Sequence, residues 1–295
     1  MIDPGLEGRV ALITGGQHGI GAATARALAA QGVGVFITYL RLHTDVDAAA
    51  AGETPGEARY YANQAQPAEG VLDEIRRSGG RAAAWEMDLG APENIPRLFE
   101  RVEATLGPVD ILINNAAHCV ADTFVPQTGP GVDGAAADRR AVDGLPMAPI
   151  TAESIDRHFA VNARATALLI AEFARRHLTR GGAWGRIISI STDGASCFPT
   201  TISYGASKHA LESYTRSAAA ELGPYGVTSN ILSLGPVQTG WISPEMERAM
   251  IGEIPLRRIG QPEDVASAVV FVASRQADWI TGQLIYVGGG HVMPL

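Results

Sequence analysis

The sequence predicts an α/β fold in which helices cover both faces of a parallel sheet. Short, continuously apolar segments alternate with amphipathic segments along most of the 295 residues. Continuous apolar segments are typical of strands buried on both faces, and strands that alternate with helices form a doubly wound parallel sheet. No internal repeat or second apolar core interrupts the pattern, so we expect a single domain over residues 1–295.

Seven strands are expected from the apolar segments. They cover residues 9–14, 34–40, 81–87, 109–113, 185–190, 227–234 and 283–287. The segments between them place apolar residues at helical spacing. The expected helices cover residues 22–30, 71–78, 95–106, 155–178, 206–222 and 262–273, and residues 241–257 combine a loop with a helix.

Two connections are too long for ordinary links between a strand and the next helix. Residues 43–68 and 118–150 are rich in Ala, Gly and Pro, and we interpret both as insertions. They follow the second and fourth strands. In a parallel sheet both insertions therefore lie at the carboxyl edge, where α/β proteins bind ligands. We expect residues 118–150 to shape the access of a ligand.

A glycine-rich turn follows the first strand, with glycines at 15, 19 and 21. Strand, glycine turn and helix in this order are the context of a phosphate-binding turn. Glycines let the backbone approach a pyrophosphate, and the helix N-terminus offers N–H groups and a positive dipole end. The Gly-x3-Gly-x-Gly spacing is wider than that of many dinucleotide sites. A tight turn without a ligand is the alternative.

The end of the second strand indicates which dinucleotide would fit. A site for NAD usually carries Asp or Glu there, to bind the ribose 2′-hydroxyl. Here no acid occurs before Asp45, whereas Arg41 follows the strand directly and His18 lies in the glycine turn. Both could face a 2′-phosphate, so the sequence favours NADP(H) over NAD(H). A solvated Arg41 is the alternative.

Tyr204 and Lys208 stand four residues apart, and Lys208 is the only lysine in the chain. On a helix they share one face, one turn apart. An ammonium beside a phenol favours the phenolate and lowers its pKa from about 10, which makes Tyr204 a candidate acid/base. A chain that otherwise uses Arg has a reason to keep the compact charge of Lys here. A solvated surface lysine is the alternative.

Composition and charge exclude several classes of partner. The net charge is -8 and no Lys/Arg cluster occurs, which argues against nucleic acid. Cys119 and Cys197 make no disulfide framework, as expected of a protein of the reducing cytoplasm. No signal peptide is recognisable and no apolar segment approaches the roughly 20 residues of a membrane span. We expect no metal site.

Several motifs in the right order resemble the short-chain dehydrogenase/reductase family. They are Thr14-Gly15 to Gly19-Ile20-Gly21, Asp88, Asn114-Asn115-Ala116, Asn162, the serine-bearing end of the fifth strand, and Tyr204-x-x-x-Lys208. Residues 260–266 and 280–283 are similar to the 3-oxoacyl-acyl-carrier-protein reductase branch. Ala117, Leu234 and Gly288 depart from the family's pattern, but none of them removes a proton-transfer group.

The resemblance implies a Rossmann-type fold and an NADP(H)-dependent oxidoreductase that reduces a carbonyl, or oxidises a secondary alcohol, by hydride transfer. Tyr204 would exchange a proton with the carbonyl oxygen, Lys208 would bind the nicotinamide ribose, and Asn162 would hold a water. Asp88 would accept from the adenine amino group, with a helix N-cap as the alternative. The implied cofactor contacts are Gly15, Gln17, His18, Gly19, Ile20, Gly21, Arg41, Asp88, Leu89, Asn115, Ala116, Ala117, Tyr204, Lys208, Gly235, Val237 and Thr239.

The hydroxyl that orients the carbonyl is either Ser191 or Thr192. Counting back from Tyr204 by the family's usual spacing reaches Ser191, whereas counting along the strand from Gly185 reaches Thr192. A shift of one residue reverses the face on which a strand side chain lies, so only one of the two can point at the substrate. The spacing slightly favours Ser191. Residues 196–199, the insertion 118–150 and Trp241 would form the walls of the substrate pocket.

Two other functions are compatible with the same fold. One is a nucleotide-binding regulator without turnover, against which the intact pair of Tyr204 and Lys208 argues. The other is an epimerase or dehydratase, which usually has a larger C-terminal substrate domain. Members of the family resembled are commonly tetramers, so we expect a homotetramer, or a dimer, packed through residues 155–178, 206–222 and the C-terminal segment.

Overall fold

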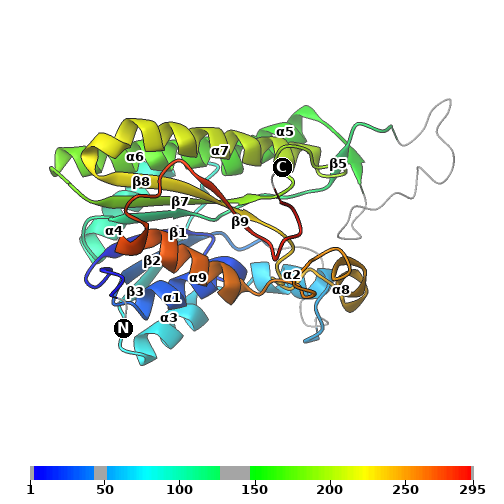
Figure 1. The fold of residues 1–295 in the computed structure, drawn as a ribbon, viewed down its shortest axis with the longest axis horizontal. Coiled ribbons are helices and arrows are strands. Elements are labelled where there is room, and N and C mark those ends of the chain that lie inside the picture. Colours follow the sequence, from blue (N-terminus) through cyan, green and yellow to red (C-terminus); the bar gives the residue numbers. More distant parts are fainter. Residues whose placement is uncertain (1–2, 43–51, 127–146, 294–295) are drawn as a thin grey trace.

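The structure is a computed structural model that describes residues 3–42, 52–126 and 147–293. Its centre is a seven-stranded sheet (Figure 1). The strands are β1 (Val10–Thr14), β2 (Gly34–Tyr39), β3 (Ala82–Glu86), β4 (Ile111–Asn114), β7 (Gly185–Thr192), β8 (Val227–Leu234) and β9 (Leu284–Val287). They lie in the order β3-β2-β1-β4-β7-β8-β9, and all neighbouring strands are parallel. The predicted doubly wound Rossmann-type sheet is confirmed.

Helices cover both faces of this sheet. Alternate residues of each strand point to opposite faces, so the apolar strands contribute side chains to a core on each side. Ile13 and Ile111 belong to an apolar core on one side, and Leu12 and Leu112 to a second core on the other. The first core packs under α1 (Gly19–Ala29), α3 (Glu69–Arg77) and α9 (Pro262–Ala273). The second core packs under α4 (Asn94–Thr105), α6 (Ala165–Thr179) and α7 (Ile202–Leu222).

Two of the predicted helices differ from expectation. The helix expected over 155–178 consists of α5 (Ala152–His158), a π-helical turn (Phe159–Arg164) and α6. Such turns are frequent at functional sites, and this one contains Asn162. The helix expected over 206–222 begins at Ile202, so Tyr204 lies in its first turn. The N–H of Ser203 there donates to the carboxylate of Asp122 at 3.0 Å, and an anion at a helix N-terminus is stabilising.

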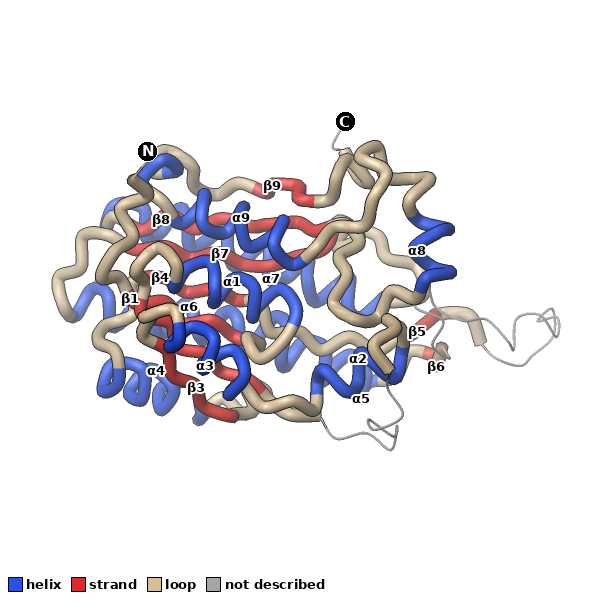
Figure 2. The backbone as a smooth tube through the Cα atoms, turned by 90° about the horizontal axis from the view of Figure 1, so that it is seen from below, coloured by secondary structure: helices blue, strands red, loops and turns tan. Residues whose placement is uncertain are grey.

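The described parts of the two insertions lie at one end of the sheet. Residues 43–51 of the first and 127–146 of the second lie outside the described residues. The first contributes α2 (Glu57–Gln64), and the second contributes the paired β5 (Asp122–Thr123) and β6 (Ala148–Pro149). Figures 1 and 2 both show these elements, with α8 (Pro244–Met250), at the same end of the molecule.

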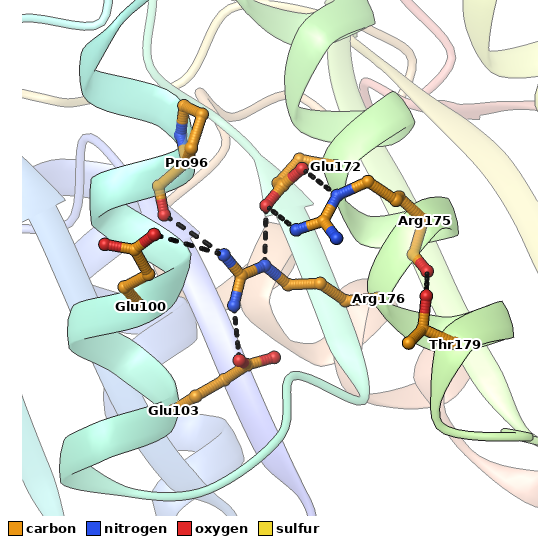
Figure 3. A network of polar contacts seen from close by, with 7 residues as sticks. All are labelled: Pro96, Glu100, Glu103, Glu172, Arg175, Arg176 and Thr179. Atoms are coloured by element: carbon orange, nitrogen blue, oxygen red, sulfur yellow. Dashed lines mark hydrogen bonds and ion pairs between the residues drawn. The ribbon is translucent and has the colours of Figure 1, made fainter.

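A largely buried arginine ties α4 to α6 (Figure 3). Arg176 donates to Glu172 at 2.6 Å, to Glu103 on α4, and to the carbonyl of Pro96 at 3.3 Å. Hydrogen bonds from Arg175 and Arg176 hold the pKa of Glu172 below its ordinary value, although burial opposes them. Charge-assisted bonds of this kind are stronger than neutral ones. They fix the helix that follows the π-helical turn.

No helix in the described ranges has the length and apolar character that crossing a membrane requires. Within the same ranges, no group of three His, Cys, Asp or Glu side chains could hold a metal ion.

Candidate active site

A cleft of about 230 Å³ opens at the carboxyl ends of β1 and β4, where the strand order reverses. Ligands of doubly wound sheets bind at this switch point. The cleft brings together most of the predicted cofactor contacts, namely Gly15, Gln17, His18, Gly19, Ile20, Gly21, Asp88, Leu89, Asn115, Ala116, Ala117 and Thr239. It also includes residues that the sequence did not single out, among them Tyr39, Tyr60, Gln64 and His118.

The glycine turn is held closed by the end of β4. Asn115 donates through Nδ2 to the carbonyls of Thr14 and Gly15, at 2.8 and 2.9 Å. The hydroxyl of Thr14 accepts the N–H groups of Asn115 and Ala116, both at 2.9 Å. A Cβ at Gly21 would overlap the carbonyl oxygen of Gly15. Only glycine at position 21 therefore permits this close approach of the two backbone segments.

Polar groups beside this turn are left for a ligand. Helix α1 begins at Gly19 without a side-chain cap and without an acidic residue in its first turn. Among the described residues, Gln17 Oε1 and His18 Nδ1 are buried without a hydrogen-bond partner. Buried polar atoms are rarely left unpaired unless something binds them. The uncapped helix N-terminus fits the diphosphate of a dinucleotide, and so does a neutral His18 that carries its proton on Nδ1. Gln17 Oε1 can only accept, so it fits a donor such as a ribose hydroxyl.

His18 and Arg41 do not lie as the 2′-phosphate prediction expected. Burial lowers the pKa of His18 to about 4, so its ring is neutral and supplies no positive charge at neutral pH. Arg41 does not line the cleft. Its guanidinium donates to Glu86 at 2.9 Å, because Glu86 is the register partner of Tyr39 on the neighbouring strand. The Glu86 carboxylate is close in space but distant in sequence. It already pairs with the Arg41 guanidinium, the group that was predicted to bind the 2′-phosphate.

Asp88 lies at the rim of the cleft, as the sequence indicated. Its Oδ1 accepts the N–H of Gly90 at 2.7 Å, which fixes a local turn. Helix α4 has Glu93 at its N-cap, so Asp88 is not the cap that was the alternative. Leu89 beside it is buried.

The side chains of Lys208 and Tyr204 face the end of β7. Lys208 is 1% exposed, and its ammonium donates to the carbonyl oxygen of Ile190 at 2.8 Å. The same nitrogen lies 5.7 Å from the centroid of the Tyr204 ring. The alternative of a solvated lysine is therefore wrong. Burial lowers the pKa of Lys208 to about 8, which leaves it mostly cationic at pH 7.

The pKa of Tyr204 moves in the direction opposite to the prediction. Burial of the phenol raises its pKa well above the ordinary value, and the nearby Cys119, Tyr60 and Asp193 act in the same direction. The cost of burying a phenolate therefore exceeds the attraction of the Lys208 ammonium, whose hydrogen bond goes to Ile190. In the protein alone Tyr204 is a neutral phenol and a proton donor.

Asn162 links the cleft to α7 through its side chain. Its Oδ1 accepts the N–H of His118 at 2.7 Å. Its Nδ2 donates to the carbonyl of His118 at 2.8 Å and to Ser207 Oγ at 2.9 Å. Both amide protons are thus committed, so the side chain has no donor left for the predicted water. The amide instead joins the loop after β4 to the helix that carries Tyr204.

Ser191 and Thr192 have different surroundings at the end of β7. The hydroxyl of Ser191 is buried and donates to Glu212 Oε1 at 2.7 Å. Glu212 stands four residues after Lys208 on the buried face of α7, a spacing that could have identified it. The hydroxyl of Thr192 accepts the N–H of Gly194 at 3.3 Å, which leaves its proton available.

The segments after β8 and β9 support the site from the other side. Thr239 packs over Gly19, where a Cβ would lie 3.0 Å from the Thr239 methyl. Val237 is buried and does not line the cleft, and neither does Gly235. A Cβ at Gly288 would lie 2.9 Å from the backbone nitrogen of Gly235, which explains why the chain has glycine at 288.

His291, in the segment after β9, contacts the residue that follows Thr192. Nδ1 of His291 lies 2.7 Å from the carboxylate of Asp193, the residue after Thr192. No local sequence pattern could have predicted this pair, because its members are 98 residues apart.

Comparisons with known proteins agree with this geometry. The profile described as Enoyl-(Acyl carrier protein) reductase matches residues 132–291, and the profile described as KR domain matches residues 10–131. The chain is 34% identical to the uncharacterized oxidoreductase YjdA of Bacillus subtilis, over 96% of this chain and 97% of that one. It is 32% identical to versicolorin reductase stcU of Emericella nidulans, over 97% and 96%. A short chain dehydrogenase from Burkholderia cenocepacia, solved in complex with NADP, has a TM-score of 0.75 at 29% identity, over 97% and 98%.

Proposed function

Because the chain belongs to the short-chain dehydrogenase/reductase family of oxidoreductases, we propose that it reduces a carbonyl, or oxidises a secondary alcohol, with NADP(H). The observation that carries this proposal is the buried ammonium of Lys208, one helical turn from Tyr204 and joined through Ser207 and Asn162 to the cleft. A pure nucleotide sensor has no need of a buried acid/base pair.

The cofactor would lie along the cleft. The glycine turn and the N-terminus of α1 would hold its diphosphate, Asp88 and Leu89 its adenine, and Thr239 its carboxamide. When bound, the nicotinamide supplies or accepts the hydride, and its oxidised form adds a positive charge.

In reduction, Tyr204 would donate its phenolic proton to the oxygen of a carbonyl whose carbon receives the hydride, which would give the alcohol. A neutral Tyr204 has the proton that this step requires. The phenolate that remains is stabilised by the Lys208 ammonium. In oxidation the same groups run in reverse, with Tyr204 taking the hydroxyl proton.

Removal of the Tyr204 hydroxyl tests the proposal. We expect wild-type protein to consume NADPH with members of a panel of ketones, aldehydes, 3-oxoacyl thioesters and versicolorin, the last taken from the name of the versicolorin reductase relative. Tyr204→Phe should lose about 100- to 10,000-fold in kcat/KM, the usual contribution of a general acid, with the Kd for NADPH within a few-fold of wild type. A variant that retains activity contradicts the mechanism. Tight binding of NADPH without turnover in either direction would favour the non-catalytic regulator.

We assign the substrate-orienting hydroxyl to Thr192 rather than Ser191, because the proton of Ser191 is committed to Glu212. Thr192→Ala should lower kcat/KM by about 100-fold, as loss of a hydrogen-bond donor to a developing oxyanion does, and Thr192→Ser should restore it. Ser191→Ala, the matched control, should lower the midpoint of urea unfolding but change kcat less than about threefold, since it removes the hydrogen bond that the buried Glu212 Oε1 accepts. The opposite ranking of the two alanine variants in kcat/KM would return the assignment to Ser191.

The proposed preference for NADPH requires Arg41 to exchange Glu86 for the 2′-phosphate of the cofactor. The side chains of Arg41 and Glu86 are 40% and 32% exposed, and an exposed ion pair contributes only about 0–1 kcal/mol. A 2′-phosphate, which carries more charge and accepts two parallel N–H bonds from a guanidinium, can therefore displace Glu86. The adjacent end of β2 provides no carboxylate that would select the 2′-hydroxyl of NADH.

Removing either charge of this pair should change the Kd for NADPH but not the Kd for NADH. We expect Arg41→Gln to raise the Kd for NADPH about tenfold, the loss of a charge-assisted contact of about 1.4 kcal/mol. Glu86→Gln should lower that Kd, because it removes the competitor, and neither variant should change the Kd for NADH more than about twofold. Calorimetric titration measures all six constants. An unchanged Kd for NADPH in Arg41→Gln, or a wild type that prefers NADH, contradicts the assignment.

We further propose a homotetramer built through α6, α7 and the C-terminal segment. Large apolar side chains lie exposed on these elements, among them Leu168 on α6, Tyr214 on α7 and the fully exposed Trp279 before β9. Exposed apolar side chains on helices of this kind mark protein–protein contacts when they gather in patches.

A further inference from the structure

The short helix α2, from the first insertion, is docked on the turn that follows β8. The N–H of Gly56 at its start donates to the carbonyl of Gly240 at 2.7 Å, and Asn63 Nδ2 donates to the carbonyl of Thr239 at 3.3 Å. A Cβ at Gly240 would lie 2.6 Å from Asn63 Nδ2, and φ of this glycine is +106°. The turn therefore has glycine where the helix approaches most closely.

The far end of α2 is attached to the opposite rim of the cleft. The N–H of Leu42, just after β2, donates to the carbonyl of Gln64 at 3.3 Å. In a doubly wound sheet the strands β1 to β3 hold one nucleotide half and the strands beyond the switch point hold the other. Because α2 contacts segments that follow β2 and β8, it spans from the adenosine half to the nicotinamide half.

One face of this helix is turned into the cleft. Tyr60 and Gln64, one helical turn apart, both line it. None of the residues 58–64 is exposed, although a helix on the surface of a protein normally leaves one polar face in water. In Figures 1 and 2 α2 lies at the same end of the molecule as β5 and α8.

Tyr60 reaches the middle of the cleft from this face. Its ring meets the ring of His18 edge to face, with centroids 6.4 Å apart and planes at 86°. His18 belongs to the phosphate-binding turn, and Thr239, which accepts from α2, belongs to the nicotinamide end. Burial is the main cause that raises the pKa of Tyr204, and Cys119 and Tyr60 add to it, so the two phenols are within electrostatic range. Tyr60 thus contacts the phosphate-binding turn and lies within electrostatic range of Tyr204.

We propose that α2 covers the nicotinamide half of the bound dinucleotide and that Tyr60 contacts the cofactor there. The phenol is suited to this position, because its ring excludes water from an apolar surface while its hydroxyl donates to a ribose or diphosphate oxygen. The inference rests on the proposed function, since it places NADP(H) in the cleft. The insertion then serves to bind the cofactor, in a chain whose glycine turn and β2 end contact only the diphosphate and adenosine.

The test compares a whole cofactor with a fragment that lacks its nicotinamide half. Calorimetric titration of the full-length protein with NADPH and with 2′,5′-ADP gives the Kd of each. Tyr60→Ala should raise the Kd for NADPH about tenfold, equivalent to the loss of roughly 30 Å² of buried apolar contact and one weak hydrogen bond. The Kd for 2′,5′-ADP should stay within about twofold. Tyr60→Phe, which keeps the ring and therefore the packing of α2, should show a smaller increase of about threefold for NADPH alone.

Tyr61→Ala is the matched control, because Tyr61 is the next residue of the same helix but does not line the cleft. It should bind both ligands as wild type does. Equal Kd values for NADPH in Tyr60→Ala and wild type would overturn the inference. So would an equal weakening of NADPH and 2′,5′-ADP by Tyr60→Ala, which would show a general disturbance of the site. If the wild type binds no dinucleotide at all, the proposed function itself fails.

Discussion

The structure depends on one buried charge, the ammonium of Lys208. A cation removed from water is costly unless it is hydrogen-bonded or paired. The carbonyl of Ile190 accepts from it at 2.8 Å, and Glu212 lies one turn further along α7. Both groups are positioned by regular structure, since Ile190 lies near the carboxyl end of the central strand β7 and α7 packs directly on that strand. The remaining cost appears as the lowered pKa of Lys208.

Hydrogen bonds, together with short stretches of the chain itself, connect this charge to the cleft. Asn115 closes the glycine turn at the end of β4, and three residues later the backbone of His118 is clamped by Asn162. Asn162 in turn binds Ser207, the neighbour of Lys208. The π-helical turn places the amide of Asn162 at this junction. Buried polar networks of this kind are stable only when each member is paired, and they then hold a site rigid.

Local patterns in the sequence predicted the parts of this arrangement that local chemistry determines. Strands buried on both faces, glycines in a tight turn, and Tyr and Lys one helical turn apart are each determined within a few residues. The polar partners are different, because they come from distant positions. Glu86 faces Arg41 only through the register of two strands, and Asp122 caps the helix of Tyr204 from a segment about 80 residues earlier. Residue spacing carries no information about such pairs.

The direction of the Tyr204 pKa was mispredicted for a related reason. The spacing of Tyr204 and Lys208 predicted the cation beside the phenol, but it could not predict how completely the fold buries both groups. The desolvation of each side chain depends on everything that surrounds it, whereas the attraction depends on the position of a single neighbouring charge. The same burial that raises the pKa of the phenol lowers the pKa of the ammonium, and both follow from the packing of α7 on β7.

Because Lys208 is the only lysine, the central claim can be tested on one signal. Protein made with lysine carrying ¹³C at Cε gives a single side-chain resonance, whose position reports the charge on the amine as the pH is raised. The account predicts a midpoint at about 8, rather than the ordinary 10.5, and a shift of the resonance when NADP⁺ is added. A midpoint above about 10, with no response to NADP⁺, is the value of a solvated lysine and would contradict the account.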